Sequence, residues 1–173
     1  MAIIEAIATT YCEADVAEAG ITFSSIPQTY ERLQLRGQVR FQEGTGTDYD
    51  ILVRFNTVTS TVYSQARIYG YSSGTTGSAN QYHNRIFTGK HTGNGNDSHN
   101  YNSFIMDIYD YANTNKNAQC TIGWAAPILN SPSVGTAVAL YGQTTAISSV
   151  NVYVGGYGFT RGSVVSLYGI KSS

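Results

Sequence analysis

Charged residues are scarce in this chain. Lys, Arg, Asp and Glu together make up 12% of its 173 residues, and the formal net charge is −1. Globular domains ordinarily contain about 25% charged residues, so the polar surface must consist mainly of uncharged side chains. A chain without a strong field of one sign is poorly suited to bind nucleic acid or an acidic membrane surface. We therefore expect no nucleic-acid partner and no membrane insertion.

Cysteines and long apolar segments are also scarce. The two cysteines, Cys12 and Cys120, form neither a CxxC pair nor a disulfide framework, and we expect both to be free and buried. No apolar run reaches the length of about 18 residues that a membrane helix requires. The start, Met1–Ile4, lacks the basic residues and apolar centre of a signal peptide. The sequence therefore predicts a protein that is made in a cytoplasm, without a secretion signal.

Helical periodicity is absent, and apolar and polar residues alternate instead. The clearest example is Tyr30–Phe41, which predicts a strand with one buried face. Gly37 inside this segment predicts a β-bulge. One face of the strand carries Leu33, Leu35, Val39 and Phe41, and the other carries Arg32, Gln34, Arg36, Gln38 and Arg40. We expect these arginines to pair with neighbouring carboxylates and not to bind nucleic acid.

Similar patterns predict further short strands over residues 49–55, 63–71, 103–109, 118–124 and 138–141. Short strands separated by turn residues are typical of an all-β antiparallel two-sheet sandwich of the jelly-roll kind. We expect one such domain over residues 21–173, preceded by a short N-terminal arm over residues 1–20. The predicted core consists of Leu33, Leu35, Val39, Phe41, Ile51, Val53, Phe55, Phe104, Ile108, Ile122, Val152 and Leu167.

The two ends of the chain carry distinct patterns. Residues 1–20 are rich in Ala and acidic residues, and a short helix, an extended arm or an edge strand would fit, with the last two favoured by residues 9–12. An apolar stripe of Ile3, Ile4 and Ile7 predicts an attachment or strand-exchange element. The final segment, Ser163–Ile170, is apolar on both faces, so we expect a buried strand that the fold requires.

The polar region over residues 72–103 predicts long loops with one short strand near residues 85–87. It contains His83, His91 and His99, whose spacings of eight residues do not match the tight ligand pairs of zinc sites. We interpret these histidines as residues of a mobile polar loop. If the protein binds a receptor, His83, His91, His99, Tyr82 and Tyr101 are the candidate loop contacts.

Other candidates for chemistry have structural interpretations. A cluster of oxygen-bearing side chains lacks the alternation of a calcium loop and suits a turn: Asp107, Asp110, Asn113 and Asn115. No GxSxG nucleophile motif is present. Trp124 lies in an apolar strand and is predicted to be in the core or at an interface, with stacking on sugar rings as the alternative. We expect no enzymatic activity, no catalytic residue, no metal and no cofactor.

Four segments together resemble a family of tailed-bacteriophage virion proteins: residues 21–40, 51–56, 104–117 and 144–171. The most specific parts are the turn block Asp110–Lys116 and the ending Gly162-Ser163…Ser166-Leu167-Tyr168-Gly169-Ile170. Members of that family carry a jelly-roll domain that ends in this signature. The chain departs from the family pattern at residues 31–32 and 56–58.

The resemblance implies a virion structural protein without catalytic residues. We expect a capsid decoration or cement protein that binds the major capsid protein or other virion proteins. The alternative is a tail-fibre or receptor-binding adhesin domain that recognises a host-surface carbohydrate. Threefold assemblies recur among such virion proteins, and strands that are apolar on both faces indicate buried contacts between subunits. We therefore expect a homotrimer on the capsid surface or tail.

Overall fold

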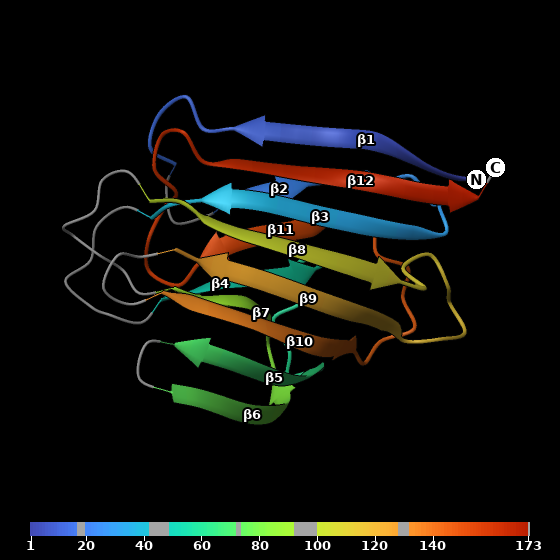
Figure 1. The fold of residues 1–173 in the computed structure, drawn as a ribbon. Helices are drawn as coiled ribbons and strands as arrows, with labels where there is room; N and C mark the ends of the chain where they lie inside the picture. Colours follow the sequence, from blue (N-terminus) through green and yellow to red (C-terminus); the bar gives the residue numbers. More distant parts are fainter. Residues whose placement is uncertain (17–19, 42–48, 72–73, 92–99, 128–131, 173) are drawn as a thin grey trace.

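The computed structural model describes residues 1–16, 20–41, 49–71, 74–91, 100–127 and 132–172. These residues form twelve strands in two antiparallel sheets, which pack as a β-sandwich (Figure 1). None of the described residues forms a helix, so no helix of the described part is long and apolar enough to cross a membrane. The all-β sandwich predicted from the sequence is therefore confirmed.

The larger sheet has eight strands and the smaller has four. In spatial order, the larger sheet consists of β1 (Ala2–Tyr11), β12 (Val164–Ser172), β3 (Arg32–Val39), β8 (Asn102–Tyr109), β9 (Ala118–Ala126), β10 (Ser133–Tyr141), β5 (Tyr63–Tyr71) and β6 (Gly74–His83). The smaller sheet consists of β2 (Ile21–Phe23), β11 (Val150–Val154), β4 (Tyr49–Phe55) and β7 (Ile86–His91). Within the smaller sheet, β7 is the edge strand that lies against β9, β10 and β8 of the larger sheet.

The core lies between the two sheets and is formed by the apolar positions of each alternating strand. All twelve residues that the sequence predicts for the core are buried, with Leu33, Leu35 and Phe55 fully so. Both cysteines are free and buried, as predicted. Trp124 is 6% exposed and belongs to the core cluster, which confirms its core assignment. Period-two alternation therefore identified the buried face of these strands correctly.

The last strand is an interior strand of the larger sheet. β12 pairs with β1 on one side and with β3 on the other, so that Leu167 lies opposite both Ala8 and Leu35. Leu167 is 0% exposed. The expectation that the final strand is buried is therefore confirmed, and the strand is not a frayed edge.

Two expectations about local structure are wrong. The polar region after residue 72 contains β6, a ten-residue strand, in addition to the short strand expected near residues 85–87. Gly37 does not form a bulge, because β3 pairs with β12 and β8 in an uninterrupted register through this position. Gly37 instead makes room for the ring of Phe104 on the adjacent strand, which a Cβ atom would overlap.

Candidate functional site

We refer to the side of the eight-stranded sheet that faces away from the four-stranded sheet as the outer face. The buried positions of each strand point toward the core, so the alternate positions define this face. Its outward side chains fall into two groups with different chemistry. We call the part formed by β12, β3 and β8 the charged half, and the part formed by β9, β10, β5 and β6 the uncharged half.

The charged half is a network of paired side chains. Arg32 Nε lies 3.9 Å from Asp107 Oδ1, and Gln34 Nε2 donates a hydrogen bond of 3.0 Å to the same oxygen. Arg36 Nε donates to Gln34 Oε1 at 2.7 Å, and its guanidinium lies 4.7 Å from the ring centre of Tyr168. The expected pairing with a carboxylate is confirmed for Arg32. Because the partners of Arg32 and Arg36 lie in the sheet itself, these side chains are engaged without a ligand.

The uncharged half combines protruding apolar side chains with very small ones. Val134 and Val138 of β10 are 63% and 57% exposed, and Ile68 of β5 is 55% exposed. Of the outward side chains that the structure describes on these four strands, none is charged. They are Gln119, Thr121, Gly123, Ala125, Val134, Thr136, Val138, Leu140, Ser64, Ala66, Ile68, Gly70, Thr75, Gly77 and Ala79.

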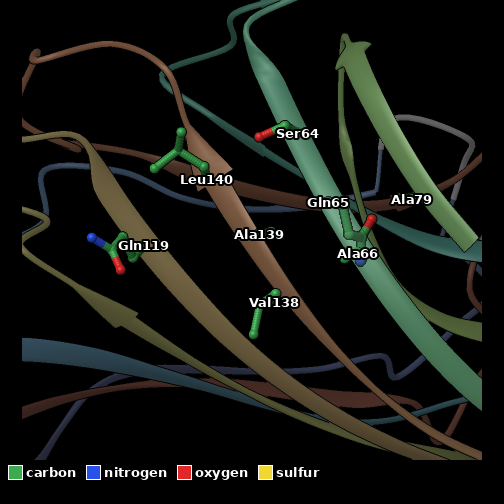
Figure 2. Close-up of a pocket in the computed structure, with 8 residues that line it drawn as sticks. All are labelled: Ser64, Gln65, Ala66, Ala79, Gln119, Val138, Ala139 and Leu140. Atoms are coloured by element: carbon green, nitrogen blue, oxygen red, sulfur yellow. The ribbon is translucent and has the colours of Figure 1, made fainter.

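Two shallow depressions lie between the protruding side chains of the uncharged half. One, of about 370 Å³, has Ala66 and Ala79 among its lining residues and is flanked by Val138 and Leu140 (Figure 2). The other, of about 570 Å³, lies at the opposite end of the same strands beside Val134. The surface therefore presents apolar projections next to apolar hollows. Such relief permits interdigitation with another β-sheet face.

The residues predicted as loop contacts do not form one cluster. His83 ends β6, is half-buried and packs edge-on against Phe87, with ring centres 5.6 Å apart. Tyr101 lies at the opposite end of the larger sheet, where its hydroxyl donates a 2.8 Å hydrogen bond to the carbonyl of Arg161. The side chains of Tyr82 and His91, and the whole of His99, lie outside the described residues.

The carboxylates considered for calcium are engaged by cations. Asp107 faces Arg32, and Asp110 Oδ1 lies 3.7 Å from Lys116 Nζ. Asn113 Oδ1 accepts a hydrogen bond of 2.8 Å from the backbone N–H of Asn115, which is the turn role expected of it. The side-chain oxygens considered for calcium are therefore engaged by other groups of the same chain.

The N-terminal arm is an edge strand of the larger sheet. Glu5 anchors it, because Lys171 Nζ lies 2.8 Å from Glu5 Oε1 and Tyr30 donates a 3.0 Å hydrogen bond to Oε2. The hydrogen bond from Lys171, and then that from Tyr30, lowers the pKa of Glu5 below its ordinary value. Of the predicted stripe, Ile4 is 52% exposed, whereas Ile3 and Ile7 are half-buried. Of the three stripe residues, Ile4 is therefore the one that the arm leaves largely in solvent.

Sequence reasoning missed the protruding residues of the uncharged half. The available signal was the pair Val134 and Val138, which occupy alternate positions out of phase with the buried Ala137 and Ala139. Apolar residues at solvent-facing positions of a strand indicate that the outward face of the sheet, in addition to its core face, contacts another protein.

No family model, curated protein or solved structure matches this chain.

Proposed function

We propose that this chain is a non-enzymatic structural protein of a tailed-bacteriophage virion, in which it decorates or cements the capsid. The resemblance in the turn block and the closing signature supports the virion setting. The single observation that carries a structural role is the uncharged half of the outer face, with Val134, Val138 and Ile68 all more than half exposed. Large contiguous apolar patches on a protein surface usually mark contacts with other proteins.

The use of polar groups supports a role without catalysis. His83 packs against an aromatic ring, and Asp107 and Asp110 face cations. Tyr63, a buried phenol, donates to the backbone carbonyl of Phe55, and burial raises the pKa of its hydroxyl to about 12. A phenol whose pKa is raised in this way keeps its proton at neutral pH, so Tyr63 serves the structure and is poorly placed to transfer protons.

The proposal assigns the protein to the capsid surface as a homotrimer that contacts the major capsid protein. The edge strand β1 supplies the attachment element, since Ile4 is exposed there and Glu5 fixes the strand in place. Deleting residues 1–11 should leave a folded domain that no longer joins particles. Sedimentation of particles mixed with the deleted and intact chains measures this directly. Equal binding of both chains would exclude β1 as the attachment element.

Receptor binding in a tail fibre remains the second candidate because of one exposed aromatic residue. Tyr71 is 40% exposed and lines the larger depression of the uncharged half together with Pro127, Pro132 and Thr75. A tyrosine ring beside a hydroxyl group offers both the apolar surface and the polar contact that a sugar uses.

The number of copies per particle separates the two functions. A decoration protein coats the capsid, whereas a fibre is present in few copies at the tail. Quantitative mass spectrometry of purified virions should therefore find this chain in amounts comparable to those of the major capsid protein. A yield of only a few chains per particle would favour the fibre, and absence from virions would refute the proposal as a whole.

A further inference from the structure

We propose that the uncharged half of the outer face is the contact between copies of this chain, and that three copies pack these faces around a common axis. The inference deepens the proposed function and rests on it for the biological setting, but the contact itself is argued from the molecule. The occupant of the surface is a second and a third copy of the same chain.

The distribution of charge favours copies of the chain over a different partner. Near a symmetry axis each side chain faces the same side chain of another copy, so a charged residue there would meet its own sign. Charges are present on the same outer face at Arg32, Arg36 and Asp107, but none is described on the outward positions of β9, β10, β5 and β6. A hydrophobic centre with charges displaced to the rim is the usual anatomy of a stable interface.

The size of the surface fits a specific contact. Four strands about 4.8 Å apart give a face about 19 Å wide, and eight residues at about 3.4 Å each give a length of about 27 Å. The flat projected area of this face is thus about 500 Å². The protruding side chains make its accessible surface larger than this projection. The projected area approaches the roughly 800 Å² of accessible surface that each partner contributes to a standard interface.

The width of the face also selects threefold packing. Three faces about 19 Å wide enclose a triangular prism with an inscribed radius of about 5.5 Å. Side chains in front of a sheet occupy about 5 Å, which is half of the separation of about 10 Å between packed sheets. Three uncharged halves would therefore fill the prism with Val, Ile, Thr and Ala side chains and leave no wide channel. Adding the charged strand β8 to each face would open the axis.

The same packing explains Ile105, the exposed apolar residue at the border of the two halves. Ile105 lies on β8 beside Gly123 of β9 and is 41% exposed. At each corner of the prism, the edge strand β6 of one copy lies next to β9 of the neighbouring copy. The β5–β6 hairpin of the first copy would then cover Ile105 of the neighbouring copy.

Light scattering of the purified full-length chain at micromolar concentration tests the inference. We expect a mass of three chains for the wild type and of one chain for Val138→Lys, which places three ammonium groups at the axis. Gln38→Lys is the matched control, because Gln38 is an exposed outward residue of β3 in the charged half, and its mass should stay at three chains. Since Val138 is 57% exposed in the single chain, the variant should keep its strand content by circular dichroism.

Cross-linking gives a second reading that does not depend on a disruptive change. Val138→Cys should form, with a short bifunctional maleimide, one linked pair and one unlinked chain per trimer, because the native cysteines are buried. A linker is needed because sheets about 5.5 Å from the axis hold the Cα atoms of two copies about 10 Å apart, beyond the reach of a direct disulfide. A monomeric or dimeric wild type, a trimeric Val138→Lys, or equal loss of the trimer in Gln38→Lys would each overturn the inference. These outcomes require no virions. Absence of the chain from particles refutes the proposed function alone, whereas an unaffected Val138→Lys trimer refutes only the assignment of the contact.

Discussion

Replacing Leu167 with Asp should unfold the domain at neutral pH. Leu167 is 0% exposed and lies in the interior strand β12, with Ala8 opposite on β1 and Leu35 opposite on β3. The side chain points into the core between the two sheets, so a carboxylate at this position cannot reach water without disrupting both ladders. The experiment therefore examines whether the last strand is essential to the fold.

The expected loss comes from two effects. Removal of the leucine side chain costs about 2–5 kcal/mol, as for buried Leu→Ala substitutions. Burial raises the pKa of a carboxyl group by about 3 units, and each unit corresponds to about 1.4 kcal/mol, so ionisation adds about 4 kcal/mol at neutral pH. The sum of about 6–9 kcal/mol is comparable to the entire stability of a domain of this kind, about 5–15 kcal/mol.

Leu167→Asn is the matched control, because its side chain has nearly the same shape but does not ionise. The pKa of the introduced Asp is raised in the folded state, so the folded protein binds more protons than the unfolded one, and stability falls as pH rises. The two variants should therefore have similar stability near pH ~4 and diverge by about 1.4 kcal/mol per pH unit above it, until the raised pKa is reached.

Urea titration monitored by fluorescence measures both variants, because Trp124 is the single tryptophan and is buried in the core. The difference in unfolding free energy between Leu167→Asp and Leu167→Asn is the quantity of interest. If the two variants remain within about 1 kcal/mol of each other at neutral pH, the introduced carboxylate is solvated. That result would refute the conclusion that β12 is locked inside the sheet.

Two further substitutions examine the packing beside β12. Gly169→Ala should destabilise the protein by about 1–3 kcal/mol, because the ring of Tyr30 covers Gly169 and a Cβ atom would overlap it. The control Gly155→Ala meets only an ordinary contact at 3.6 Å and should stay within about 0.5 kcal/mol of the wild type by urea titration; equal losses would contradict the reasoning. Glu5→Gln should lower the thermal midpoint slightly at neutral pH, because Lys171 lowers the pKa of Glu5 and so stabilises the folded state above the ordinary glutamate pKa. This difference should vanish as pH falls through the lowered pKa, and a difference that persists in acid would refute the ionic origin.

The strands with one buried face could be predicted from sequence because apolar and polar residues alternate along them. The apolar residues face the core and the polar residues face solvent. In β3, Leu33 and Leu35 face the core while Arg32 and Arg36 face outward, and the structure has this arrangement. The period of two in a strand makes such a pattern independent of the neighbouring strands. Strand identity and core membership were therefore accessible without knowledge of topology.

β6 could not be predicted in the same way. Its sequence, Gly74–His83, contains no large aliphatic residue, and the strand lies at the edge of the larger sheet. An edge strand with few core contacts carries no hydrophobic period, so its Gly, Ser and Asn residues resemble a loop. Pairing with β5, from Tyr71↔Gly74 to Tyr63↔His83, makes it a strand.

The uncharged half of the outer face depends on strand order, which sequence does not reveal. Ile68 and Val138 are separated by seventy residues in the chain, yet they lie on the adjacent strands β5 and β10. Each residue alone is an unremarkable exposed aliphatic side chain. Only the spatial order of strands assembles them into one surface. Gly37 illustrates the same limit, since the reason for a glycine at this position is the ring of Phe104 on the next strand.

The pairing of the first strand with the last brings the two ends of the chain to one corner of the molecule (Figure 1). Ala2 lies opposite Ser172, so a short linker could join the ends without distorting either strand. A circular permutant opened in the exposed turn over residues 114–116 would convert β12 and β1 into a hairpin. The β1–β12 pairing, which joins residues far apart in the natural sequence, would then join residues that are close in sequence. Because low contact order speeds folding, such a permutant should refold faster than the natural order of strands.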